Sequence, residues 1–312
     1  FSGVAILDPR DCDAIAFAEG YRGRYNDAIL RLYNALLHIG IRAEYRNVRQ
    51  LREDALERDG IRVLFLPFRP CVDPWMAEKL RAFVEAGGVV IAESPFALKN
   101  TTGIHYEVTP GLMTDLFGVQ VFDLEKLKES TCGALPAYDF KTVAEPKGGN
   151  VEATFADGTP AIITNRYGKG GTVLYLSQVS AAYQIEKPFY PNDIPVISYE
   201  DGQTFRNELS RRLSAAGIAP GWEFEEIDRE ETRKYLQIFR RNLPDGRKLL
   251  FILNMDENPH QFTLQFPGIE CFETIGASSP EEQPVTGNRV ECALAPWGWA
   301  VLTGVAATGG EK

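Results

Sequence analysis

Apolar and polar positions follow a regular pattern at the start of the chain. Residues 3–7 form a continuous apolar run that ends at an Asp-Pro pair, which is typical of a parallel strand buried on both faces. Over residues 25–37 the apolar side chains recur at helical spacing, and Gly40 follows where a left-handed helix cap is favoured. The pattern predicts a buried strand followed by a helix with one buried face.

The same alternation of strand and helix continues to residue 92. Asp73 is predicted to be a helix N-cap, Pro74 the first residue of that helix, and Gly87 and Gly88 its end. Further strands are predicted at residues 43–48, 61–67 and 89–92. Strands that alternate with helices indicate an α/β fold with an open, doubly wound parallel sheet of flavodoxin-like type.

From residue 94 the pattern is less regular. We expect a long loop that carries Asn100, His105 and Tyr106, a short helix near residues 112–117, and irregular structure over residues 123–150. The chain is then predicted to form three strands joined by turns within residues 151–178, a proline-bearing loop over 187–195 and a helix over 203–216.

Beyond residue 218 short strands with turn residues replace the helical pattern. They are predicted at residues 235–241, 249–253, 261–266, 290–294 and 299–302. We therefore expect an α/β domain over residues 1–218, a small antiparallel β-sandwich over 219–306 and a frayed tail over 307–312.

Composition and charge narrow the range of partners. The chain has 312 residues, 33 Lys and Arg against 43 Asp and Glu, and a formal charge of −10, which argues against a nucleic-acid partner. No apolar run reaches the roughly 20 residues that a membrane span needs, and the first residues lack the features of a signal peptide. Because the chain lacks an initiator Met, we expect a segment of a longer protein, and a signal peptide on the missing part stays open.

Cysteine and histidine give little support for a metal or cofactor. The five cysteines are far apart without a C-x-x-C pair, so we expect reduced, mostly buried thiols and a cytoplasmic location. None of the three histidines has a second His or a Cys at ligand spacing, and the loops after the predicted strands lack a phosphate-binding glycine motif. We predict no metal and no cofactor.

Two positions have an alternative chemical interpretation. Cys71 follows the third predicted strand, where class I glutamine amidotransferases place their nucleophile, but Pro70 and Val72 replace the flanking glycines of a tight elbow. We therefore expect Cys71 to be buried. Trp297 and Trp299 are spaced to lie on one strand face, where they would either fill the core of the sandwich, which we prefer, or stack on a sugar.

Several stretches together resemble the β-galactosidases of glycoside hydrolase family 42. They are the strand and turn region 157–176 with its Tyr-Gly-Lys-Gly-Gly turn at 167–171, the helix end Leu-Arg-Ala-Phe-Val-Glu-Ala-Gly-Gly at 80–88, Asp-Leu-Phe-Gly-Val at 115–119 and Leu-Ala-Pro-Trp-Gly-Trp-Ala-Val-Leu at 294–302. The resemblance spans nearly the whole chain. It implies an amidotransferase-like trimerisation domain without amidotransferase chemistry, followed by the small C-terminal β-domain of that family.

The resemblance also implies where the chemistry lies. Family members place a catalytic TIM barrel with two glutamates and a retaining mechanism before this region, so no residue here inherits a catalytic role. The parent would cleave terminal β-galactosyl residues, and this segment would supply the contacts of a homotrimer and a wall of the neighbouring active site. The residues expected at that contact are Phe68, Arg69, Trp75, Asn100, His105 and Tyr106.

Two other functions stay open from the sequence. The chain is an alternative candidate for a stand-alone carbohydrate-binding module if its surface aromatic residues line a groove. It would be a small amidotransferase-like enzyme if Cys71 were exposed with a lowered pKa.

Overall fold

The computed structural model of the chain describes residues 2–20, 22–127, 131–138, 140–183, 202–227, 230–278 and 285–306. The predicted loop over 187–195 and the tail over 307–312 lie outside these residues. The described chain divides into two compact units. The first unit runs to Ile218 but leaves out Leu36–Arg42. The second unit contains Leu36–Arg42 and the chain from Ala219.

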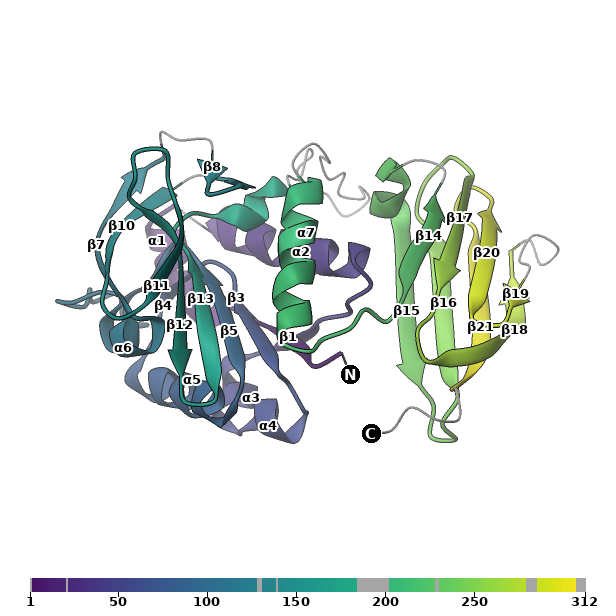
Figure 1. Cartoon of the computed structure of the whole chain (residues 1–312), viewed down its shortest axis with the longest axis horizontal. Coiled ribbons are helices and arrows are strands. Elements are labelled where there is room, and N and C mark those ends of the chain that lie inside the picture. Colours follow the sequence, from purple (N-terminus) through teal and green to yellow (C-terminus); the bar gives the residue numbers. More distant parts are fainter. Residues whose placement is uncertain are drawn as a thin grey trace. The chain divides into compact units, whose positions relative to one another are not determined.

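A seven-stranded sheet forms the centre of the first unit (Figure 1). Its strand order is β11-β12-β13-β5-β3-β1-β2. Neighbouring strands from β2 to β13 run parallel, whereas β12 and β11 are antiparallel additions. The strands are β1 (Val4–Leu7), β2 (Glu44–Arg46), β3 (Val63–Leu66), β5 (Val89–Glu93), β11 (Asn150–Thr154), β12 (Pro160–Tyr167) and β13 (Gly170–Tyr175). The α/β pattern expected for this part of the chain is confirmed.

Local sequence accounts for these elements. All four residues of β1 and of β3 are buried, as in a parallel sheet covered on both faces. Pro74 stands at the start of α5, and Gly87 adopts a φ of 122° at its end, a conformation that side-chain-bearing residues rarely take. The α-helices are α1 (Asp13–Ala18), α2 (Arg22–His38), α3 (Val48–Arg52), α4 (Ala55–Arg58), α5 (Pro74–Ala86), α6 (Thr114–Phe117) and α7 (Gly202–Ala215).

Two helices meet at one cavity beside the sheet. Leu32 of α2 and Phe205 and Leu209 of α7 line it together with residues of β3, β5 and β13. Helices α3, α4 and α5 form a second group that contact one another (Figure 1). The parallel sheet therefore has helical cover built from segments far apart in sequence.

Three sequence expectations for this unit are wrong. Residues 123–150 are not irregular, because β7 (Val119–Lys126) and β10 (Phe140–Pro146) form an antiparallel ribbon. The long loops after β3 and β5 contain the short parallel strands β4 (Arg69–Cys71) and β6 (Phe96–Lys99). The second strand ends at Arg46, because Asn47 forms a capping box with Gln50 and starts α3.

The N-cap prediction at Asp73 is half right. Asp73 is the residue before α5 with extended backbone, but its side chain makes no cap hydrogen bond. Its carboxylate instead accepts hydrogen bonds from the backbone N–H and the hydroxyl of Thr101, at 2.9 and 2.7 Å. The side chain therefore anchors the loop after β6 to the start of α5.

The second unit consists of two four-stranded antiparallel sheets, β14-β17-β20-β19 and β15-β16-β21-β18. Their buried residues, among them Leu250, Phe262, Leu264 and Leu302, form one hydrophobic cluster. The strands are β14 (Glu223–Ile227), β15 (Leu236–Asn242), β16 (Lys248–Asn254), β17 (His260–Gln265), β18 (Ile269–Ala277), β19 (Val285–Thr286), β20 (Arg289–Leu294) and β21 (Trp299–Ala306). Strands β14, β18 and β19 were not predicted from the sequence.

Candidate functional site

The carboxyl ends of the parallel strands hold the first of the predicted contact residues. Phe68 and Arg69 follow β3, and both side chains are buried. The Arg69 guanidinium forms an ion pair with Asp11 and donates a hydrogen bond to the Asp8 carbonyl at 3.4 Å. These contacts fix the loop after β1 against β4.

The loop after β6 holds three further predicted residues. The Asn100 carboxamide oxygen accepts hydrogen bonds from the backbone N–H groups of Thr102 and Ile104, at 3.1 and 2.9 Å. The Tyr106 hydroxyl donates to the Val72 carbonyl at 2.5 Å, whereas the His105 side chain is exposed. Asn100 and Tyr106 therefore shape the loop, and His105 lies at its surface.

Trp75 lies apart from this loop, on the first turn of α5. The guanidinium of Arg52 sits 4.2 Å above the centre of the indole ring, a cation–π arrangement that covers part of the half-buried side chain. The assignment of Phe68, Arg69, Trp75, Asn100, His105 and Tyr106 to a subunit contact stays a prediction.

Exposed apolar side chains lie on the segments around this loop, a feature that the sequence analysis missed. Phe17 of α1 and Ile104 are 69% and 66% exposed, and Val108 and Phe122 are also exposed. A Cβ atom on Gly103 would lie 2.9 Å from the Ile15 side chain, so the loop approaches α1. An antiparallel bridge joins the residues after Val108 and before Phe122, which places these two side by side. We call Phe17, Ile104, Val108 and Phe122 the apolar surface.

A buried acid ends strand β5. The Glu93 carboxylate accepts hydrogen bonds from the backbone N–H of Ser180, at 2.9 Å, and from its hydroxyl, at 2.5 Å. Burial raises the pKa of Glu93 from 4.5 to about 7, since the hydrogen bonds from Ser180 offset only part of the desolvation. The adjacent cavity has a volume of about 20 Å³, which is room for about one water molecule, so a sugar does not fit there.

Glu93→Gln is expected to make the protein more stable at pH 8. Because the pKa of Glu93 is higher in the folded chain, the folded state binds more protons than the unfolded state between about pH 4.5 and pH 7. The free energy of unfolding therefore falls as the pH rises through this range, by about 3 kcal/mol in total. Urea titrations between pH 5 and pH 8 should show that the variant lacks this fall. Glu78→Gln, at an exposed position of α5, should follow the native curve, and equal slopes for native protein and Glu93→Gln would contradict the assignment.

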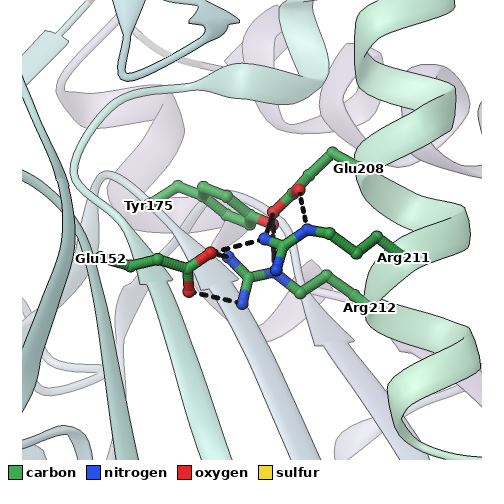
Figure 2. Close-up of polar contacts among 5 residues, drawn as sticks. All are labelled: Glu152, Tyr175, Glu208, Arg211 and Arg212. Atoms are coloured by element: carbon green, nitrogen blue, oxygen red, sulfur yellow. Dashed lines mark hydrogen bonds and ion pairs between the residues drawn. The ribbon is translucent and has the colours of Figure 1, made fainter.

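A network of charged side chains joins α7 to the sheet (Figure 2). Glu208 accepts hydrogen bonds from the Tyr175 hydroxyl at 2.7 Å, from Arg211 at 2.8 Å and from Arg212 at 2.7 Å. Glu152 of β11 binds both arginines from the other side. Burial alone would raise the pKa of Glu208, but the hydrogen bonds from Arg211 and Tyr175 lower it. Each charge is met by an opposite charge, so the network is suited to hold the fold together.

Three described side chains that could take part in nucleophilic chemistry, those of Cys71, Ser94 and His260, are buried. Cys71 is fully buried, as predicted. The neighbouring Cys12 side chain and burial raise the pKa of the Cys71 thiol. The Ser94 hydroxyl is buried against that of Thr142. In the second unit His260 bridges Asp256, at 2.8 Å, and the Thr232 hydroxyl, at 3.0 Å, but His260 and Thr232 are also buried. A sugar or amide substrate cannot reach these groups.

Trp297 and Trp299 contradict the preferred sequence interpretation. Their side chains are 58% and 42% exposed and do not fill the sandwich core. Trp297 occupies the turn before β21 with a φ of 56°, and Trp299 begins that strand, whose inward positions are taken by Ala300 and Leu302.

The described residues contain neither a cluster of metal ligands nor a helix that could span a membrane. Among the residues that the structure describes, no group of three or more His, Cys, Asp and Glu side chains could hold a metal ion. Within the same ranges no helix is long and apolar enough to cross a membrane.

These features define an α/β domain with a parallel-dominated sheet, followed by a β-domain of small antiparallel sheets. The family model for the β-galactosidase trimerisation domain matches residues 8–191. The chain therefore belongs to the β-galactosidase trimerisation domain family. No significant match was found among curated proteins.

Solved structures with the same fold include several β-galactosidases, one of them from family 42. A catalytic mutant of the family 42 enzyme from G. stearothermophilus aligns with a TM-score of 0.70 and 16% identity, over 97% of this chain and 40% of that one. The enzyme from the haloarchaeon Halorubrum lacusprofundi gives 0.65 and 16%, over 98% and 39%. The enzyme from Bacillus circulans gives 0.66 and 16%, over 90% and 38%. The chain thus spans about two fifths of the length of these proteins.

Proposed function

We propose that this chain is the non-catalytic, subunit-contact region of a family 42-like β-galactosidase that assembles as a homotrimer. The observation that carries the proposal is the trimerisation-domain match over residues 8–191. The titratable groups described above support this proposal. The charges around Glu208 are paired with one another, and Glu93 is buried beside a cavity too small for a sugar. The two catalytic glutamates would lie in a TIM barrel outside this chain, and the substrate would be a terminal β-galactoside.

The finer description of the fold is also a proposal. We assign the parallel sheet to the flavodoxin-like, amidotransferase-like type, which its parallel strand order β2-β1-β3-β5-β13 supports. We place the domain boundary between residues 218 and 219, with a β-sandwich over 219–306. The five free cysteines support a reducing, cytoplasmic location.

The subunit contact is best placed on the apolar surface and the adjoining His105. Large apolar side chains that are exposed in a single chain are typical of protein interfaces. Phe68, Arg69, Asn100 and Tyr106 would then act from behind this surface by fixing the loop that presents it. Trp75, on the first turn of α5, would contribute to the contact separately from this surface.

Replacing Ile104 by Asp is expected to weaken trimer formation by about 2 kcal/mol, or about thirtyfold in affinity, for each subunit contact. A carboxylate at this position would be buried without a partner in the assembled state. Sedimentation velocity across a concentration series measures the effect. Ile275→Asp is the matched control, because Ile275 is also an isoleucine, is 61% exposed and lies in the second unit. If the two variants associated equally well, the subunit contact would not include Ile104.

The exposure of Trp297 and Trp299 favours a second candidate function, carbohydrate binding by the C-terminal unit. Exposed indole rings offer faces on which a sugar ring can stack. Tryptophan fluorescence titrated with galactose and β-galactosides separates the candidates. A saturable change that is lost in Trp297→Ala supports sugar binding, and no change at any concentration leaves the assembly function alone.

A further inference from the structure

Two cysteines that are far apart in the sequence meet inside the first unit. Cys12 ends the short 3-10 helix η1 (Arg10–Cys12) after β1, and Cys71 ends β4. The Cys12 thiol donates a hydrogen bond to the Cys71 carbonyl oxygen, which lies 3.8 Å from Cys12 Sγ, and the Cys71 side chain has the largest effect on the pKa of Cys12. Both are free and buried, at 1% and 0% exposure.

Charged side chains of both signs act on the pair, with Asp11 opposing the effect of Arg69 on Cys12. The buried Arg69 is two residues before Cys71 and acts electrostatically on both thiols, and the buried Lys99 acts on Cys71. The Cys71 side chain lowers the pKa of Cys12 below its ordinary value, with help from Arg69 and in spite of burial and of the Asp11 carboxylate. The Cys12 side chain and burial raise the pKa of Cys71. The two thiols are therefore unequal, with the thiolate favoured at Cys12.

We propose that Cys12 and Cys71 are a redox modification site, which hydrogen peroxide converts into an intramolecular disulfide. In the first step the Cys12 thiolate attacks one peroxide oxygen, the O–O bond breaks, and hydroxide leaves and takes up a proton to form water. Cys12 is then a sulfenic acid. In the second step the Cys71 thiol loses its proton and its sulfur attacks Cys12 Sγ. The S–O bond breaks, and hydroxide takes up the proton as a second water.

The proposed bond would join segments that non-covalent contacts already hold together. Arg69 beside Cys71 is paired with Asp11 beside Cys12, so the two sulfur atoms are kept near each other in the reduced protein. The remaining cysteines lack such a partner thiol in the described contacts: the Cys132 thiol contacts the Ala161 carbonyl, and Cys271 is exposed. Cys12 and Cys71 therefore differ from the remaining cysteines in having a second cysteine beside them, and not in being more exposed.

The test is disulfide mapping of the full chain treated with hydrogen peroxide under native conditions. We expect an intact mass lower by two hydrogens and a cross-linked peptide pair that contains Cys12 and Cys71. Cys12→Ser and Cys71→Ser should each abolish this species, whereas Cys271→Ser should leave it unchanged. The disulfide map of the native chain tests the proposal even if a serine variant fails to fold.

Treatment in urea is the second arm of this experiment. Unfolded chains should give mixed pairings among the five cysteines, because the folded geometry no longer selects a partner. Native chains whose Cys12 and Cys71 stay reduced while Cys271 gains oxygen would overturn the proposal. So would the same mixture of pairings in native buffer and in urea.

Discussion

Replacing Gly170 by Ala is expected to destabilise the protein by about 3 kcal/mol or more, or to prevent folding. Gly170 begins β13, directly after the turn from β12. A methyl group on its Cα would overlap the carbonyl oxygens of Gly88 and Val84, which are backbone atoms at the end of α5. Because these oxygens belong to the backbone, relieving the overlap would require β13 to move away from the end of α5. Such a movement would disturb the parallel pairing of β13 with β5. Urea denaturation of both proteins measures the loss.

Gly158→Ala is the matched control for this effect. Gly158 has a φ of 84° in the turn between β11 and β12, but an added methyl group there would meet nothing within 4 Å. The control therefore reports only the strain of a left-handed residue, about 1 kcal/mol. Similar losses for the two variants would show that the overlap at Gly170 is relieved by small movements.

The glycine contact also connects two of the sequence stretches that carry the family resemblance. The turn at 167–171 and the helix end at 80–88 touch through backbone hydrogen bonds, from Lys169 N–H to the Glu85 carbonyl at 3.1 Å and from Gly171 N–H to the Gly88 carbonyl at 3.3 Å. The glycines in both stretches permit this close approach. The motif is thus a packing contact and not a phosphate-binding loop.

Replacing Glu208 by Ala is expected to cost about 3 kcal/mol of stability. The Tyr175 hydroxyl would lose its acceptor, and the Arg212 guanidinium, whose side chain is 9% exposed, would keep only Glu152 as a carboxylate partner. Thermal and urea unfolding measure the loss. Because Arg212 contributes to the same network, Glu208→Ala and Arg212→Ala together should cost less than the sum of the two single changes.

An exposed ion pair serves as the control for the network. Asp245 and Arg247 form a bond of 2.7 Å, but both side chains are about half exposed. Asp245→Ala should leave the unfolding curve unchanged within error, since exposed pairs add little to stability. If Asp245→Ala lowered the free energy of unfolding as much as Glu208→Ala, burial would not explain the contribution of the Glu208 network to stability.

Sequence patterns predicted the elements that depend on local chemistry. The apolar run of β1, the spacing of apolar residues in α2, and the Pro74 and Gly87 that bound α5 are confirmed, because burial and backbone conformation there follow from a few neighbouring residues. The β7–β10 ribbon was missed because its exposed surface does not give a clear apolar alternation.

The features that bear on function were harder to predict because they depend on distant parts of the chain. Cys12 and Cys71 are 59 residues apart, and their contact exists only once β4 is in place. Glu208, Arg211 and Arg212 have the helical spacing of an ion-pair group, a signal that the sequence contains. Their partner Glu152 on β11 was not predictable from that spacing. The exposure of Trp297 depends on a turn with positive φ, which its residue type does not favour.

The central claim is that this chain carries subunit contacts of a trimer. Light scattering coupled to size-exclusion chromatography, over a range of loading concentrations, measures it most directly. We predict a species of three times the 34.8 kDa chain mass, without hydrolysis of a chromogenic β-galactoside. A chain that stays monomeric at every concentration would contradict it.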